Sequence, residues 1–127
     1  LNNGKKYLTV VDAVVAGEGN GPVTPDRVES GLLLAGFNPV AVDCVAAKIM
    51  GFDYLKVPHL RESFAVKGFP LVDFKYQDIM VFSDKVEWNK PLWDISPESV
   101  FKFEPSPGWK GHIELDQHLI HDAPLDT

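Results

Sequence analysis

The stretch GLLLAGFNPVAVDCVAAKIMGFD at residues 31–53 decides the fold of this chain. Its first part belongs to an apolar run, residues 29–37, which has the length of a strand and lies between two loop signals, so we expect a strand there. Asn38 and Pro39 then combine a capping side chain with a proline at the first helical position, where its missing N–H is not needed. These residues predict a helix over 39–50, ended by Gly51 in a left-handed conformation.

The segments on either side extend this unit to an α/β fold. Residues 7–15, YLTVVDAVV, are apolar on both alternating faces apart from Thr9 and Asp12, which is typical of a buried strand in a parallel sheet. We expect a second helix over 58–66 and a third strand over 79–82, reached by a right-handed crossover onto one sheet. The predicted fold class is therefore α/β, a small parallel or mixed sheet with two helices packed on it.

The chain changes character from about residue 87. All three tryptophans and half of the ten prolines lie beyond that point. We therefore divide the chain into an α/β core at 1–86 and an irregular, proline- and tryptophan-rich C-terminal extension at 87–127 that wraps the same domain. Segments 99–104 and 112–115 are candidate edge strands within this extension.

Length and composition describe one folded domain and exclude several classes of protein. With 127 residues, 45% of them hydrophobic, the chain can bury a real core. A net charge of -6 without a basic cluster argues against nucleic acid and anionic membranes as partners. No apolar run approaches the roughly 20 residues of a membrane-spanning helix. We expect a soluble protein, with the cytoplasm favoured; export stays open because the chain begins at Leu1 and its native amino terminus is expected to be missing.

The loop GEGNGP at residues 17–22 is the first candidate for chemistry. It follows a predicted strand, as a dinucleotide fingerprint does, but its spacing differs and its prolines prevent a helix from following directly. The backbone amides of Gly17, Gly19 and Gly21 are candidates for holding an anion. The alternative is a tight structural loop that needs glycine for its backbone conformation.

Acidic side chains in apolar or glycine-rich surroundings form the second candidate. Asp12 lies in a predicted strand, Glu18 and Asn20 lie in the loop that follows, and Asp43 lies inside the predicted helix. Such carboxylates suit a hard divalent cation or general acid–base chemistry, and we treat these four residues as ligand- or metal-binding candidates. The alternative is that Asp43 faces solvent and Asp12 accepts local backbone hydrogen bonds. No residue is assigned a catalytic role.

The third candidate is the histidine group in HIELDQHLIHD at residues 112–122. His112, His118 and His121 stand beside acidic residues, and imidazole with carboxylate suits transition metals. Their spacing matches no zinc signature, which favours a solvated surface stretch over a metal site. The single cysteine, Cys44, excludes an internal disulfide, a zinc knuckle and a four-cysteine iron–sulfur site within this chain.

Two stretches together resemble the domain of unknown function 362 family. They are VVDAVVAGEGNGP at 10–22 and GLLLAGFNPVAVDCVAAKIMGFD at 31–53. The specific elements are a strand carrying an aspartate, a G-E-G-N-G-P-like loop, and an N-P-V-A-V-D helix that closes on M-G. The sequence FEPSPGWKGHIEL at 103–115 looks like the ending of some bacterial members, so the chain resembles the C-terminal part of the family domain.

The resemblance implies a redox or cofactor-linked role, because family members are often associated with ferredoxin-type iron–sulfur motifs. This chain has one cysteine, so an iron–sulfur cluster would lie on another domain or chain. By position, Asp12, Glu18, Asn20 and Asp43 fall in the stretches that look like the family's motifs. The expected partner is the missing upstream part of the same protein or an iron–sulfur protein.

Two functional hypotheses follow from the sequence. The first is part of a cofactor- or metal-dependent protein, in which the acidic residues hold a divalent cation or move protons and the glycine loop holds an anionic group. The second is a non-catalytic structural or protein-interaction module with a structural glycine loop. The second hypothesis predicts an exposed apolar patch where another domain docks, and a fully polar surface would contradict it.

Overall fold

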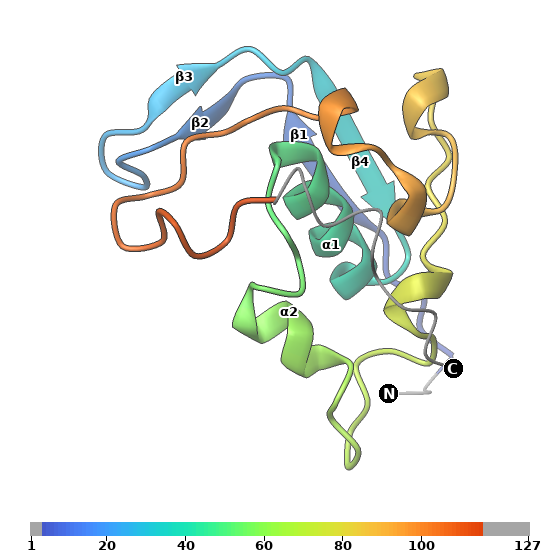
Figure 1. Ribbon diagram of the computed structural model, residues 1–127. Coiled ribbons are helices and arrows are strands. Elements are labelled where there is room, and N and C mark those ends of the chain that lie inside the picture. Colours follow the sequence, from blue (N-terminus) through green and yellow to red (C-terminus); the bar gives the residue numbers. More distant parts are fainter. Residues whose placement is uncertain (1–3, 116–127) are drawn as a thin grey trace.

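The computed structural model describes residues 4–115. Four short strands come first, two α-helices follow, and short 3-10 helices lead into an irregular carboxyl-terminal stretch (Figure 1). The elements are β1 (Thr9–Ala13), β2 (Ala16–Glu18), β3 (Asp26–Val28), β4 (Leu32–Gly36), α1 (Pro39–Met50), α2 (Pro58–Ser63) and the 3-10 helices Tyr76–Asp78, Val86–Trp88, Leu92–Asp94 and Pro97–Ser99. The α/β fold class with two helices is confirmed.

The strands pair antiparallel, which corrects the parallel arrangement expected from the first apolar run. β1 pairs with β4 in the register Thr9↔Gly36 to Ala13↔Leu32, and β2 pairs with β3. The β2–β3 hairpin turns the chain back between β1 and β4, so β4 returns beside β1 in the opposite direction. Within residues 7–15, β1 ends at Ala13 and β2 begins at Ala16, so this segment is not a single strand.

Helix α1 has the bounds that its sequence predicts, and both of its ends are capped as expected. The Asn38 side chain accepts a hydrogen bond from the Ala41 N–H (3.1 Å), and Pro39 opens the first turn. At the other end Gly51 adopts φ 93°, and its N–H donates to the carbonyl oxygen of Lys48 (2.9 Å). A Cβ at Gly51 would overlap the carbonyl oxygen of Phe101, so close approach of the extension also requires glycine there.

Two further expectations are wrong in detail. The second helix, α2, ends at Ser63 rather than at residue 66. Residues 79–82 do not join the sheet: Met80 forms only an isolated antiparallel bridge with Pro91, so no strand–helix–strand crossover is built. Of the candidate edge strands at 99–104 and 112–115, the second makes one isolated bridge, Glu114 with Phe52, and neither becomes a strand.

The core lies around α1 and is closed by the carboxyl-terminal extension. Phe101 and Phe103 donate their backbone N–H groups to the carbonyl oxygens of Ile49 (2.9 Å) and Met50 (2.8 Å). The buried cluster joins residues of both parts of the chain: Val40, Cys44, Ala47, Ile49, Phe52, Tyr54, Leu60, Ile79, Trp88, Leu92, Ile95, Phe103 and Ile113. The extension thus supplies apolar side chains to the same core as the helices.

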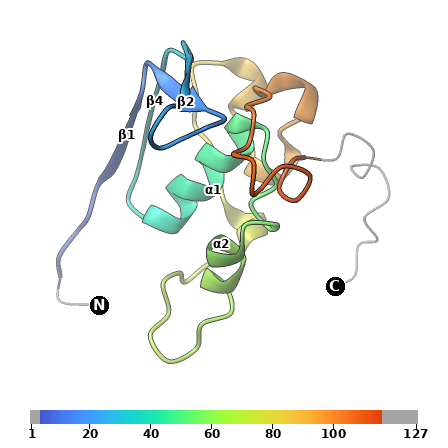
Figure 2. The same ribbon diagram turned by 90° about the vertical axis from the view of Figure 1, so that its left-hand side faces the viewer.

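These elements form three layers, with the β1–β4 sheet on the outside. Figure 2 shows this sheet on one side of α1 and the extension on the other side. Among the described residues no element covers the far side of the sheet. No helix within residues 4–115 has the length and apolar character needed to cross a membrane.

Candidate functional site

The glycine-rich loop lies at the tip of the β2–β3 hairpin, not between a strand and a helix (Figure 1). Gly19 has φ 73°, in the left-handed region that favours glycine. Gly17 lies in β2, where an added Cβ would stand 2.8 Å from the Cβ of Pro25. Two of the three glycines therefore have a local structural reason, while Gly21 lies in the exposed turn.

Glu18 and Gly19 hold the carboxyl-terminal extension to the hairpin. The Glu18 Oε2 accepts a hydrogen bond from the Glu104 N–H (2.7 Å), and the Gly19 N–H donates to the Glu104 carbonyl oxygen (2.8 Å). Two predicted ligand-binding groups, the Gly19 amide of the anion loop and the Glu18 carboxylate of the acidic site, are thus hydrogen-bonded within the protein. Their partner lies at least 85 residues further along the chain. Since Glu104 also pairs with Lys110 (2.7 Å), this contact links three parts of the chain.

The other acidic-site candidates face solvent on separate elements. Asp12 lies in β1, and its Oδ1 accepts a hydrogen bond from the Val14 N–H (3.1 Å). Asp43 is exposed on α1, and Asn20 is exposed at the hairpin tip. Within residues 4–115, no three His, Cys, Asp or Glu side chains are grouped so that they could hold a metal ion.

The histidine candidates are only partly described. His112 is exposed, and its N–H donates to the Trp109 carbonyl oxygen (3.0 Å), whereas His118 and His121 lie outside the described residues. The neighbouring Glu114 accepts hydrogen bonds from the Gly111 N–H at both carboxylate oxygens (2.8 and 3.0 Å). These backbone donors hold the pKa of Glu114 below its ordinary value, so its carboxylate stays charged and shapes this turn.

Two titratable groups lie deep in the core. Cys44 is fully buried, and burial, reinforced by the charge of Asp43, raises the pKa of its thiol to about 12. The Tyr54 hydroxyl is buried without a hydrogen-bond partner among the described residues, and burial raises its pKa as well. Because a thiol with so high a pKa stays protonated near neutral pH, Cys44 acts as a core residue and not as a nucleophile.

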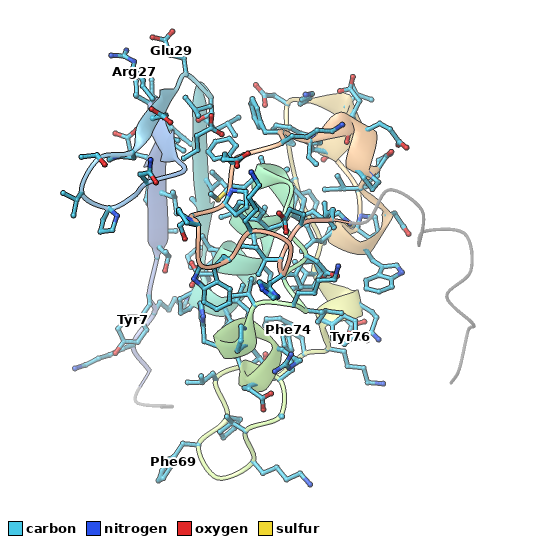
Figure 3. The ribbon with its side chains drawn as sticks, turned by 60° about the vertical axis from the view of Figure 1, so that its left-hand side comes forward. Tyr7, Arg27, Glu29, Phe69, Phe74 and Tyr76 are labelled. Carbon is cyan, nitrogen blue, oxygen red and sulfur yellow. The ribbon has the colours of Figure 1, made fainter. Side chains whose placement is uncertain are left out.

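The uncovered side of the β1–β4 sheet is apolar. Exposure alternates along both strands, so every second side chain points away from α1. We call this surface the outer face; it consists of Leu8, Val10, Asp12, Val14, Leu33, Ala35 and Phe37. Leu33 is 71% exposed and Phe37 75%, and Asp12 is the one charged member. Figure 3 shows Tyr7, 58% exposed, on the same side of the molecule just before β1.

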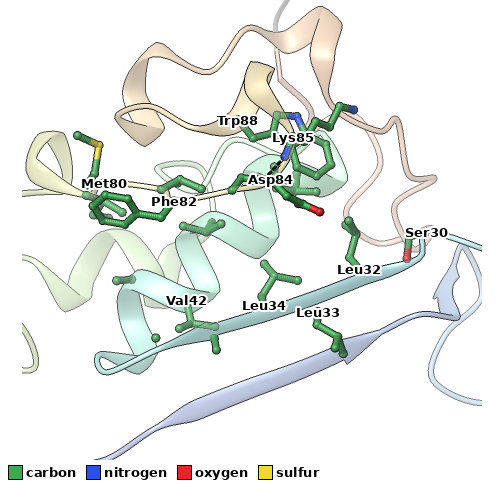
Figure 4. Close-up of a pocket in the computed structure, with 18 of the residues that line it drawn as sticks. Ser30, Leu32, Leu33, Leu34, Val42, Met80, Phe82, Asp84, Lys85 and Trp88 are labelled. Carbon is green, nitrogen blue, oxygen red and sulfur yellow. Dashed lines mark hydrogen bonds between the residues drawn. The ribbon is translucent and has the colours of Figure 1, made fainter.

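A groove of about 660 Å³ lies on the other side of β4, between this strand and residues 79–85. Figure 4 shows Leu34 directed toward the groove and Leu33 on the opposite side of the strand. The groove is also lined by Ala41, Val45 and Ile49, which share one face of α1, and by the aromatic residues Trp88 and Phe101. Its polar groups include Ser30, Ser83, Asp84 and Lys85.

The sequence predicts an exposed apolar patch under the second hypothesis, but it locates neither of these two surfaces, for an identifiable reason. The apolar pattern of residues 7–15 predicts burial on both faces, although a sheet with one uncovered apolar face has the same pattern. The groove depends on residues 79–85 running beside β4 without pairing to it. Met80 bridges to Pro91 of the extension instead, a pairing between separate segments that no local sequence pattern indicates.

Comparison with known proteins gives one match. Residues 1–48, which include β1, the hairpin, β4 and most of α1, match the family described as "Domain of unknown function (DUF362)", so this part of the chain is similar to that family. The matched range does not reach 103–115, so the resemblance of that segment to the ending of some members stays a prediction. No curated protein and no solved structure matches the chain.

Proposed function

We propose that this DUF362-related chain is a protein-interaction module, whose outer face docks against a second protein domain. The observation that carries the proposal is the exposure of contiguous apolar side chains on a sheet that has a helix on one side only. Val10 is 60% exposed and Leu33 71%, and they lie on neighbouring paired strands. Monomeric proteins rarely leave such a patch uncovered, because its contact with water is unfavourable.

The strength of the docking would come from the large side chains of the outer face. Fully burying a Val, Leu or Phe side chain contributes roughly 1.5–3 kcal/mol, and several such side chains lie on this face. Part of this gain is offset by the loss of translational and rotational freedom on association. A partner with a flat apolar surface, such as another helix layer, would convert the sheet into one covered on both faces.

Asp12 would set the orientation of the partner. Its position in the register is opposite Leu33, within the apolar surface, and its Oδ1 accepts only the local Val14 N–H bond among the contacts of the described residues. A carboxylate that becomes buried at an interface needs a donor from the partner, so we expect a lysine or arginine there. A partner without that cation would leave a buried charge unpaired.

The structural roles of the hairpin support the same proposal. Gly19 and Glu18 are engaged with Glu104, and Gly17 accommodates Pro25, so this loop has a reason to exist without a bound ligand. The cofactor- or metal-dependent hypothesis keeps Asp12, Glu18 and Asp43 as its candidate residues, and an iron–sulfur protein is one class of partner implied by the family resemblance. The apolar outer face favours docking over that hypothesis as the chain's own role.

The proposal is tested by cross-linking in the full-length protein. A photoreactive amino acid at Val10, which lies in the outer face and does not line the groove, should give one discrete cross-linked product in the cells that naturally contain the protein. Leu33→Asp should abolish this product, because it buries a charge in the interface, and Asp12→Ala should reduce it. The matched control is Val66→Asp, at a side chain that is 44% exposed beyond α2, and it should leave the product unchanged. The absence of a discrete product, or its persistence with Leu33→Asp, would contradict the proposal.

A further inference from the structure

Strand β4 has one paired edge and one open edge. β1 occupies the first edge along the whole of Leu32–Gly36. Among the described residues, no backbone hydrogen bond joins the second edge of β4 to any other segment. An open edge presents N–H and C=O groups that another extended chain can pair with.

The open edge of β4 forms one wall of the groove, and residues 79–85 form the other. Both walls are continuous runs of seven residues, 30–36 and 79–85, so the groove has the length of a strand (Figure 4). An extended chain of seven residues spans about 23 Å. A groove bounded on both sides by main chain is suited to an extended peptide more than to a compact small molecule.

The second wall also has backbone groups available. The Val81 N–H donates to the carbonyl oxygen of Lys90 (3.1 Å), and the Ile79 carbonyl oxygen accepts from the N–H of Leu92 (2.9 Å). These two backbone groups therefore point toward residues 90–92. Because backbone groups alternate along an extended chain, the N–H and C=O of Met80 point to the other side. Residues 90–92 do not line the groove, which places the groove on that other side.

Charge at the end of the groove adds a polar requirement. The Lys85 Nζ lies 4.1 Å from the centre of the Trp88 ring, and within the described residues it pairs with no carboxylate. The rest of the groove is mainly apolar and is lined by one face of α1. A segment that fits would therefore alternate apolar side chains, which face α1, with outward ones, and would carry a carboxylate near Lys85.

We propose that the groove binds a single extended segment of a partner protein, which pairs as a strand with the open edge of β4 and with Met80 and places a carboxylate at Lys85. A second copy of this chain does not fit the same place. If the β4 of a second copy entered the groove, the β1 paired to its other edge would overlap residues 79–85 of the first copy. The groove and the outer face share strand β4, since Leu33 and Ala35 also line the groove, but the Leu34 side chain points toward the groove and the Leu33 side chain points away from it (Figure 4).

The test uses the full chain, labelled with ¹⁵N, and two acetylated heptapeptides of alternating valine and threonine, one with glutamate as its last residue and one with glutamate as its first. We expect one of them to shift the amide signals of β4 and Met80 and to slow their hydrogen exchange. The matched control is the same peptide N-methylated at its second, fourth and sixth residues. It keeps the side chains and removes donors along one edge, so its Kd should rise at least tenfold.

The charge at Lys85 is tested separately from the backbone pairing. Lys85→Met keeps an unbranched stem over Trp88 and should weaken the glutamate peptide three- to tenfold, with no change for a peptide that has glutamine in its place. The proposal is overturned if neither peptide binds at 1 mM, if the N-methylated peptide binds equally well, or if the shifts lie in β1 instead of β4 and Met80. Concentration-dependent shifts of β4 without peptide would identify a second copy as the occupant and would also overturn it.

Discussion

Helix α1 and the β1–β4 sheet are neighbours with similarly apolar sequences, but the helix is covered on more of its surface than the sheet. The extension covers α1 with Trp88, Leu92 and Phe103, and most of the helix is shielded from solvent. The sheet packs one face on α1 and leaves Val10 and Leu33 exposed on the other. An apolar sequence therefore shows that a helix or sheet face is unfavourable in water, but it does not show which segment packs against that face. For α1 that segment is the extension, and for the sheet we propose that it belongs to a partner.

Truncating one leucine in each region gives the largest contrast. Leu92 is fully buried, so Leu92→Ala should lower the free energy of unfolding by about 2–5 kcal/mol through lost burial and a new cavity. Leu33 is 71% exposed, so Leu33→Ala should change the same quantity by no more than about 0.5 kcal/mol. Urea denaturation of the two variants measures both values. A large loss with Leu33→Ala in the isolated chain would mean that the outer face is already covered.

Two glycines with positive φ make it possible to measure the cost of an unfavourable backbone angle separately from the cost of a steric overlap with the extension. Gly51 has φ 93° and Gly31 has φ 67°, so alanine costs about 1–2 kcal/mol at either position. At Gly51 the added Cβ also overlaps the Phe101 carbonyl oxygen, whereas at Gly31 nothing lies within 4 Å. Gly51→Ala should therefore destabilise the chain clearly more than Gly31→Ala, because the Phe101 backbone must also shift. Thermal unfolding of the two variants gives the difference, and equal losses would show that the extension does not press on the end of α1.

Local signals in the sequence were sufficient for α1 and for β4, and insufficient for how the sheet pairs. Asn38, Pro39 and Gly51 each act through hydrogen bonds or backbone angles within a few residues, so their effect can be inferred from the sequence alone. Pairing of β1 with β4 depends on where the hairpin sends the chain. The alternation of side chains in β1 is the same in a parallel and an antiparallel sheet, so it could not decide the direction.

The candidate site was predictable only in part, for a similar reason. Asp12 and Asp43 were correctly identified as carboxylates in apolar segments, and the alternative in which one accepts a local bond and the other faces solvent describes their contacts. Glu18 pairs with the backbone of Glu104, and no local pattern announces a contact between residues so distant in sequence. Whether any of these residues binds a ligand stays a prediction.

The reactivity of a thiol in the core can be compared with that of a thiol on the outer face, and the substitution that this comparison needs has the smallest expected effect on stability. Ala35→Cys adds an exposed thiol on the outer face, while Cys44 stays in the core with a pKa raised to about 12 by burial. At pH 8 only a thiolate reacts rapidly with Ellman's reagent. The folded variant should therefore release one equivalent of the coloured thionitrobenzoate at once, from the introduced thiol, and a second equivalent, from Cys44, only after unfolding in guanidinium. The wild-type chain, which has Cys44 alone, is the matched control and should release none while folded. Because the folded protein holds this proton more tightly than the unfolded chain, the stabilisation from the protonated thiol is complete below pH 9 and is lost as the pH rises toward 12. Rapid reaction of Cys44 at pH 8 in the folded chain would mean that the reagent reaches the core around α1 as readily as it reaches the outer face.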